Sequence, residues 1–422
     1  MVVKKMIAFT VILIVLLDSA CFAKKVSFKR KAMILFCSLY PISFCIAYLN
    51  GWIPLGLLYY GITETNILMT NLAYIVFQIV MLLFPDPFIH TCEEFEFPEI
   101  NILFDTVLIC IMLLIYLQPY LPHIGEILSA STSQRRDIYG SINCIDTFRI
   151  FINLHGCLAL YSKTYRNHKA CLLVSVTCMV IVNGMLLFCG NRRETFLILL
   201  IFVPLLTSKA SEWNNSSSQL LSKRKKRILM ACAAALLFYM LAVPYLRQGR
   251  KFSLSSIGLI LQQIFGDMDC NAPYQTLAFE FNNCDSYVLF GSYIKAIPKM
   301  ITGVLRIPIN VDYTMESFVQ RMGDFFGIAN YGVGWTYSPF SEAYISFGYV
   351  GLYLLFPLCA ASVLYYTSRN KAYSQFDKGL FYMLSYQFFR GDLANFMQIF
   401  ATYMLIAFII KYFNRKVRVS TR

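Results

Sequence analysis

Residues 343–365 read AYISFGYVGLYLLFPLCAASVLY, a run without a charged side chain. Crossing a hydrocarbon core of about 30 Å takes about 20 helical residues, so this run is long enough to span a membrane. Similar runs recur along almost the whole chain, which has 58% hydrophobic and 14% charged residues. Ordinary soluble domains have roughly 45–50% and about 25%. The sequence therefore predicts a polytopic integral membrane protein.

Backbone groups in lipid must be satisfied within their own segment, and these runs are too long and too uniformly apolar for barrel strands. We therefore expect an all-α fold with about eleven transmembrane helices. The range is ten to twelve, because the tenth run is short and residues 52–62 can form a further half-helix. The runs are residues 6–22, 32–49, 66–84, 102–119, 148–162, 170–188, 194–207, 228–245, 343–365, 379–389 and 393–410.

The predicted plan is uneven along the chain. Residues 1–245 hold eight helices, residues 246–342 form one large loop, and residues 343–422 hold the last helices and a basic tail. Loops of that length usually carry function. Within the loop, residues 252–265 and 286–305 predict helices that lie in the membrane interface or pack on the spans rather than cross.

Lys and Arg are distributed unevenly over the connections between the predicted helices. One alternate set of connections has 22 of them and the other has 14. Because cytoplasmic loops carry the excess of Lys and Arg, the N-terminus and the large loop are expected outside, and the C-terminal tail inside. The net charge of +14 is then mostly an orientation signal. Nucleic-acid binding is disfavoured, since it needs a concentrated basic face on a soluble domain.

Residues 1–23 resemble a secretory signal peptide, with two lysines before an apolar stretch that ends in Ser-Ala-Cys-Phe-Ala. Five charges follow directly and would have to cross the membrane after cleavage, so we expect a retained helix. The cysteines and histidines show no zinc-ligand spacing. Cys270 and Cys284 are a candidate disulfide, because both fall in the outward loop.

Three clusters of arginine lie at the predicted outer ends of helices. The planar fork of the guanidinium group fits phosphate oxygens, so clusters at one depth can hold a pyrophosphate. The alternatives are local ion pairs, Arg193 with Glu194 or Arg390 with Asp392, and unspecific contact with lipid phosphates. The candidate residues are Arg192, Arg193, Arg247, Arg250 and Arg390.

The large loop closes at Glu342, a carboxylate at the mouth of a hydrophobic span, with two glycines three residues apart just beyond it. Such a place suits an amphiphilic substrate at the membrane surface. Tyr337, Phe340 and Tyr344 have rings that can stack on a sugar. Glu342 is our first candidate for a general base, and Asp392 is the second. A solvated carboxylate that merely begins a helix is the structural alternative for Glu342.

These features, in this order, resemble Wzy-type O-antigen polymerases. They are the glycine–arginine turn at 190–193, Arg247 and Arg250, residues 291–298, residues 338–351, and Arg390-Gly391-Asp392. The resemblance covers roughly residues 190–395, and the first half of the chain matches only in hydropathy.

The resemblance implies a glycosyltransferase at the periplasmic face of the bacterial inner membrane, with no cofactor. Such an enzyme transfers the growing glycan from undecaprenyl pyrophosphate to an incoming lipid-linked repeat unit. Membrane lipids and a chain-length regulator protein are the further partners it implies. Clustered arginines would stabilise the pyrophosphate leaving group without a metal. Asp267-Met-Asp269 has the spacing of a metal motif but no obvious partners, so no metal is expected.

Two other functions stay open at the level of sequence. A lipid-linked oligosaccharide flippase would share the size and the intramembrane arginines, but transporters usually show two related halves and lack one dominant outer loop. An O-antigen ligase uses the same donor and differs only in the acceptor.

Overall fold

The computed structural model describes residues 2–23, 26–52, 62–85, 99–130, 132–142, 146–189, 193–204, 231, 234, 268–284, 287, 290–305, 337–368 and 374–420. The regular elements within these residues are all helices. The chain divides into two compact units. Unit 1 comprises residues 1–90, 257–371 and 384–401, and unit 2 comprises residues 91–256, 372–383 and 402–422.

Seven described helices are long and apolar enough to cross a membrane: Val2–Ala23, Phe28–Leu49, Glu64–Leu83, Asn101–Ser129, Lys169–Phe188, Pro339–Ser368 and Leu393–Tyr412. They match seven of the eleven predicted runs. Three other runs, residues 148–162, 194–207 and 379–389, overlap helices that are shorter, and residues 228–245 lie almost wholly outside the described residues. The all-helical membrane class is confirmed, and the count of eleven stays a prediction.

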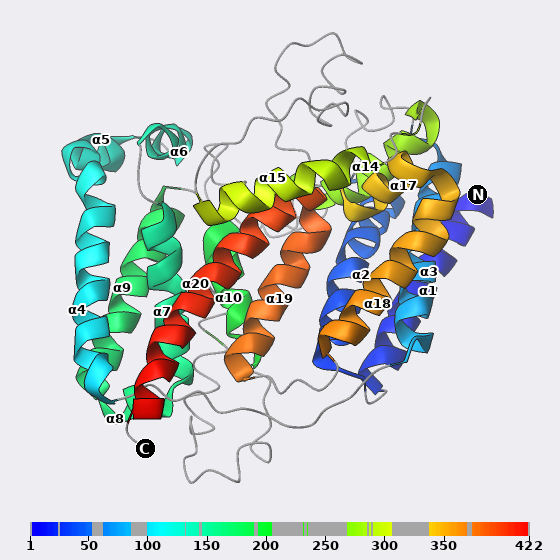
Figure 1. Cartoon of the computed structure of the whole chain (residues 1–422). Helices are drawn as coiled ribbons and strands as arrows, with labels where there is room; N and C mark the ends of the chain where they lie inside the picture. Colours follow the sequence, from blue (N-terminus) through cyan, green and yellow to red (C-terminus); the bar gives the residue numbers. More distant parts are fainter. Residues whose placement is uncertain are drawn as a thin grey trace. The chain divides into compact units, whose positions relative to one another are not determined.

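Unit 1 holds the described part of the predicted large loop and the helices on which it packs. Its helices are α1 (Val2–Ala23), α2 (Phe28–Leu49), α3 (Glu64–Leu83), α14 (Met268–Asn283), α15 (Gly291–Leu305), α17 (Pro339–Val350), the π-helical turn η5 (Gly351–Leu355) and α18 (Phe356–Ser368). Two further helices, α19 (Gln375–Arg390) and α20 (Leu393–Ser420), contribute residues to both units. The N-terminal end of α1 lies at the same end of unit 1 as α15 and α17 (Figure 1).

Helix α14 lies in the interior of unit 1, against α2, α3 and α17. Every described side chain from Pro273 to Glu280 is buried. Polar contacts fix the helix there: the Tyr274 hydroxyl donates to Asn71 Oδ1 over 2.8 Å, and Asn66 Nδ2 donates to the Ala278 carbonyl over 2.8 Å. Since unsatisfied polar groups are costly in an apolar interior, these bonds specify how α14 packs.

Helix α15 runs crosswise to the spanning helix α18 (Figure 1). It packs on α20 through Gly303, where a Cβ atom would lie only 2.4 Å from the Gln398 carbonyl oxygen. It is not among the helices that can span a membrane, which agrees with the expectation for residues 286–305.

The candidate disulfide between Cys270 and Cys284 is not formed in this structure, where Cys284 is a free cysteine. Cys270 lies near the start of α14 and Cys284 directly follows its end. At about 1.5 Å of rise per helical residue, their Cα atoms are roughly 20 Å apart. A disulfide needs Cα atoms within about 7 Å of each other.

Lysine and arginine close two helix ends in unit 1 at the predicted cytoplasmic side. The Arg30 guanidinium donates to the carbonyls of Met81, Phe84 and Pro85, where α3 ends. Lys29 Nζ lies 3.3 Å from the carbonyl oxygen of Thr367 at the end of α18. Cations are favourable at helix C-termini because the last carbonyls have no partner within the helix.

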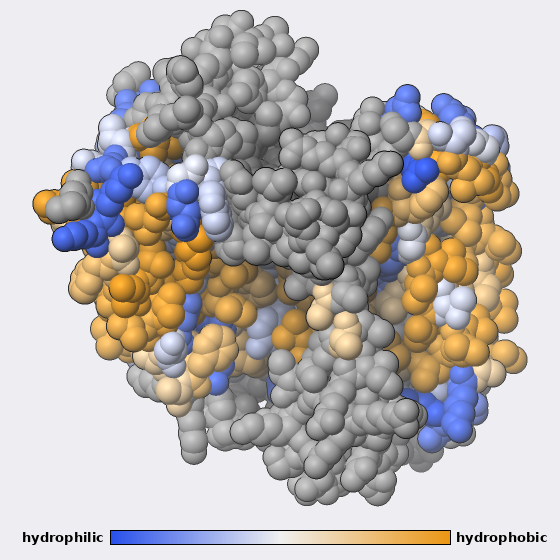
Figure 2. All heavy atoms as spheres, turned by 180° about the vertical axis from the view of Figure 1, so that it is seen from behind, coloured by the Kyte–Doolittle hydropathy of each residue, from blue (hydrophilic) through white to orange (hydrophobic). Residues whose placement is uncertain are grey.

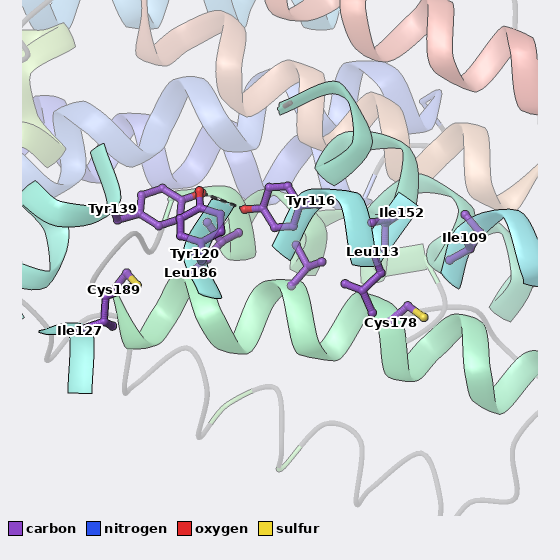
Figure 3. Packing of buried hydrophobic residues seen from close by; sticks show 11 residues of the cluster. Ile109, Leu113, Tyr116, Tyr120, Ile127, Tyr139, Ile152, Cys178, Leu186 and Cys189 are labelled. Atoms are coloured by element: carbon purple, nitrogen blue, oxygen red, sulfur yellow. Dashed lines mark hydrogen bonds between the residues drawn. The ribbon is translucent and has the colours of Figure 1, made fainter. Parts of the chain in front are cut away.

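Unit 2 is built around a second helical core. Its helices are α4 (Glu99–Leu117), η2 (Gln118–His123), α5 (Ile124–Ser129), α6 (Thr132–Ser141), α7 (Asp146–Tyr161), α8 (Lys163–Asn167), α9 (Lys169–Phe188) and α10 (Arg193–Ile201). Ile109, Leu113, Ile152 and Leu186 pack between α4, α7 and α9, and the Tyr116 and Tyr139 hydroxyls lie 3.0 Å apart (Figure 3).

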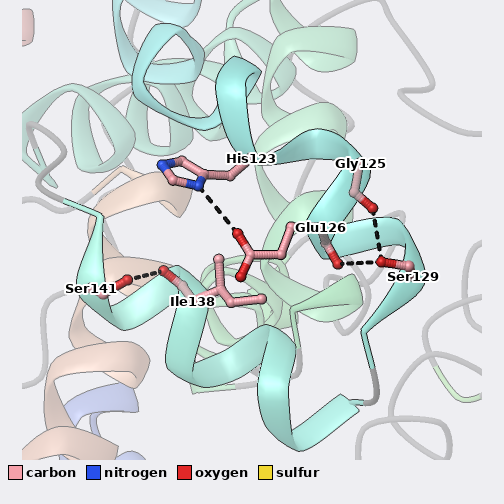
Figure 4. Close-up of polar contacts among 6 residues, drawn as sticks. All are labelled: His123, Gly125, Glu126, Ser129, Ile138 and Ser141. Carbon is pink, nitrogen blue, oxygen red and sulfur yellow. Dashed lines mark hydrogen bonds and ion pairs between the residues drawn. The ribbon is translucent and has the colours of Figure 1, made fainter.

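Helices α5 and α6 are held by short-range polar contacts (Figure 4). Ser129 Oγ donates to the Gly125 carbonyl over 3.0 Å, and His123 Nδ1 lies 3.4 Å from Glu126 Oε2.

In the space-filling view, apolar residues cover much of the described surface and hydrophilic residues gather towards the helix ends (Figure 2). That distribution suits helices that face lipid.

Candidate active site

The candidate site in unit 1 begins with the first turn of α17. Ser338 is the N-cap: its hydroxyl accepts from the Ser341 N–H over 3.2 Å, and Ser341 Oγ accepts from the Ser338 N–H over 2.7 Å. Pro339 follows at the first helical position, where its missing N–H costs nothing. Thr276 Oγ1 lies 3.1 Å from Ser341 Oγ and ties this turn to α14. The sequence Ser-Pro-Phe-Ser therefore fixes where the next residue, Glu342, points.

Glu342 reaches across to the start of α20. The side chain is 2% exposed, and its Oε2 accepts a hydrogen bond from the Leu393 N–H over 2.8 Å. Leu393 is the first residue of α20, so the carboxylate satisfies one of the free N–H groups at that helix end. Hydrogen bonds to charged groups contribute about 1.5–3 kcal/mol, and the positive end of the helix dipole adds to this.

Asp392 caps the same helix end. Its Oδ1 accepts from the Asn395 N–H over 2.6 Å, and its Oδ2 accepts from Asn395 Nδ2 over 2.7 Å. Both candidate bases, which lie fifty residues apart in the sequence, thus meet at the first turn of α20.

Arg390 lies at this place as well. It is the last residue of α19, and only Gly391 and Asp392 separate it from α20. The side chain is half-buried. The structure therefore brings Glu342, Arg390 and Asp392 together in unit 1.

The chain changes direction just after Glu342. Gly348 has φ 62° and ψ −149°, a combination that essentially only glycine adopts. Beyond this break, Gly351 approaches the Ala343 carbonyl so closely that a Cβ atom would lie 2.3 Å from the oxygen. The two glycines thus separate a short helix that carries Glu342 from the descending helix α18. Breaks and π-helical turns of this kind occur often at functional sites.

The three predicted sugar-contacting rings are buried. Phe340 is fully buried, with ring centroids of Tyr74 at 4.3 Å and Phe356 at 4.9 Å. Tyr344 packs on Phe281 at 4.8 Å, and Tyr337 is 4% exposed. In this structure Phe340 holds α17 against α3 and α18. Sugar contact by these rings stays a prediction that requires them to become accessible.

Tyr293 of α15 is a neighbour of Glu342 that the sequence did not single out. Its ring packs on Phe347, with centroids 6.2 Å apart. Burial and the charge of the nearby Glu342 carboxylate raise the pKa of Tyr293 to about 12. The phenol therefore stays protonated at neutral pH, as a hydroxyl beside the carboxylate.

Unit 2 has its own charged cluster, centred on Arg149. Its side chain is 9% exposed, and its Nη2 lies 3.4 Å from Asp146 Oδ1 and 3.9 Å from Glu194 Oε1. Glu194 Oε2 accepts from the Tyr403 hydroxyl over 3.2 Å. Glu194 thus faces Arg149, whereas the sequence suggested Arg193 as its partner. The side chain of Arg193 is exposed. In the sequence, Arg149 is a charged residue inside an apolar run, and that is the signal by which it could have been found.

The other predicted phosphate-binding residues, Arg192, Arg247 and Arg250, lie outside the described residues, as does Asp267. Arg193 and Arg390 belong to different units, so convergence of the three arginine clusters stays a prediction. Among the described residues, no three His, Cys, Asp or Glu side chains gather as metal ligands do.

Comparison of the chain with protein-family models, curated proteins and solved structures finds no match.

Proposed function

We propose that the protein is a membrane glycosyltransferase that polymerises lipid-linked oligosaccharide repeat units, similar to Wzy-type O-antigen polymerases. It transfers the growing glycan from undecaprenyl pyrophosphate to the incoming repeat unit at the periplasmic face of the inner membrane. The observation that carries this proposal is the meeting of Glu342, Asp392 and Arg390 at the start of α20.

The reaction needs a base and a stabilised leaving group. The acceptor hydroxyl oxygen attacks the anomeric carbon of the donor glycan, and the bond from that carbon to the pyrophosphate oxygen breaks. The bonding electrons leave with undecaprenyl pyrophosphate, and the hydroxyl proton passes to Glu342. Such general-base assistance typically contributes about 10²–10⁴-fold.

The positions of the charged groups agree with these two roles, the base and the stabiliser of the leaving group. Glu342 and Asp392 occupy N–H groups of Leu393 and Asn395, so the start of α20 holds carboxylates rather than a phosphate. The pyrophosphate is then left to arginine, whose fork of donors fits its oxygens. Arg390 is the described residue that can do this beside Glu342.

The substrate's lipid part requires a path along the membrane surface. Helix α15 borders the site, since Tyr293 lies near Glu342 and Phe290 packs on Phe347 with centroids 5.0 Å apart. Helix α15 also exposes the apolar side chains of Ile294, Ile297 and Leu305. An amphipathic helix of this kind lies in a membrane interface, where a polyprenyl chain and its charged headgroup meet.

The surface glycan of a deletion strain tests the proposed activity. A polymerase defect leaves single repeat units on the surface glycan while lipid-linked donor accumulates, and expression of this chain restores the ladder on a gel. Loss of all surface glycan on deletion would instead indicate a flippase or a ligase, and an unchanged ladder would exclude all three functions.

A further inference from the structure

Helices α1, α2 and α3 of unit 1 meet at an intramembrane carboxyl group that the proposed reaction does not use. Asp18 of α1 lies 2.6 Å from Ser38 Oγ of α2 and 2.9 Å from Gln78 Nε2 of α3, measured from its Oδ1. Ser38 and Gln78 are 1% and 0% exposed. Because α1 ends at Ala23, Asp18 lies about five residues, or roughly 7 Å, inside that helix.

The number of hydrogen atoms available decides the charge of this group. Ser38 Oγ lies 2.6 Å from Asp18 Oδ1, 2.6 Å from the Ile34 carbonyl oxygen and 2.8 Å from Gln78 Nε2. A hydroxyl has one hydrogen to donate and can accept two. If Asp18 were ionised, both Asp18 and Ile34 would need that single hydrogen, and one contact of 2.6 Å would join two acceptors.

A proton on Asp18 Oδ1 satisfies every contact. The carboxylic acid donates to Ser38 Oγ, Ser38 donates to the Ile34 carbonyl, and the two Gln78 N–H groups donate to Ser38 and Asp18. Each short distance then contains one hydrogen. We propose that Asp18, Ser38 and Gln78 form a proton-binding site within the membrane, which holds its proton while the three helices are packed together and releases it when they separate.

The surroundings of Asp18 contain no compensating cation at contact distance. Within the described part of the chain, its two polar contacts are to Ser38 and Gln78, and both are neutral. A titratable side chain that faces it, the thiol of Cys37 on α2, is uncharged at neutral pH. An isolated carboxylate in such a place is costly, so it holds a proton instead.

Two described cations near the start of α2 have contacts elsewhere. On α2, Arg30 donates to the carbonyls that end α3, and Lys31 Nζ lies 6.0 Å from the centre of the Phe22 ring. A metal cation fits less well than a proton, because it would need oxygen atoms pointing at it. Gln78 turns its amide nitrogen, rather than its oxygen, towards Asp18.

The test is modification by dicyclohexylcarbodiimide, a membrane-soluble reagent that adds to protonated carboxyl groups. The full-length protein in vesicles is treated at neutral pH, with and without sodium, and its peptides are analysed by mass spectrometry. We expect Asp18 to be modified regardless of sodium, and the modification to disappear in Asp18→Asn. Asp377, which is ion-paired with Lys411, is the matched control and should remain unmodified.

Three results would overturn the proposal. Asp18 could remain unmodified at neutral pH while reacting at acidic pH, which would show it to be ionised. Protection by sodium would show that a metal cation, not a proton, occupies the site. A large loss of thermal stability in Asp18→Asn would also contradict it, because an asparagine amide reproduces the donor and acceptor of the protonated acid.

Discussion

At the scale of single residues, the proposed roles rest on properties of a carboxylate or a guanidinium group that its closest substitute lacks. Glu342 has a structural task, because it caps α20 through the Leu393 N–H. Glutamine can accept the same hydrogen bond but is no base. The structural and chemical roles of this residue can therefore be separated by one substitution, Glu342→Gln.

Arg390 allows a similar separation. Arg390→Lys retains the charge but loses the planar fork that binds two phosphate oxygens, so we expect shorter polymer at equal protein level. The matched control is Arg135→Lys, because Arg135 donates to the carbonyls of Ile127 and Leu128 and has no place in the proposed site. Gel ladders of the surface glycan measure both. Full-length polymer from Arg390→Lys would show that the guanidinium fork of this residue is not needed to bind phosphate.

At the scale of elements, the break at Gly348 determines where Glu342 lies. In Gly348→Ala, the alanine backbone must adopt φ near +62°, and the new methyl group would lie 2.9 Å from Cζ of Tyr287. A residue held in such a backbone region costs about 1–3 kcal/mol, so we expect a lower unfolding temperature and less polymer. Gly184→Ala in α9, where nothing lies within 4 Å, should leave the unfolding temperature unchanged or slightly raised. Equal unfolding temperatures of the two variants would mean that the backbone break at Gly348 is not needed for stability.

The elements also show how far the sequence could predict the structure. Seven spanning helices could be predicted from their apolar runs, because the thickness of the bilayer sets the length of an apolar helix that crosses it. The residues that form the site could be named, but not their meeting, because the bond from Glu342 to Leu393 joins distant segments. Asp18, Ser38 and Gln78 likewise lie on three different helices, and no local pattern links them.

At the scale of the whole molecule, two features agree with the orientation expected from the charges. In unit 1, the N-terminal end of α1 lies at the same end as α15 and α17, which belong to the predicted outward loop or close it (Figure 1). Lys29 and Arg30, in the predicted cytoplasmic connection, contact the opposite ends of α18 and α3. This arrangement agrees with the outward position of the site that the proposed reaction requires.

The most direct measurement is chain growth by the purified protein in vesicles supplied with lipid-linked repeat units. It compares wild type with Glu342→Gln and Asp392→Asn, since asparagine caps a helix about as well as aspartate. The account predicts that Glu342→Gln slows chain growth by about 10²–10⁴-fold without unfolding, while Asp392→Asn retains most activity. Wild-type ladders from Glu342→Gln, or loss of growth in Asp392→Asn alone, would contradict the assignment of Glu342 as the base.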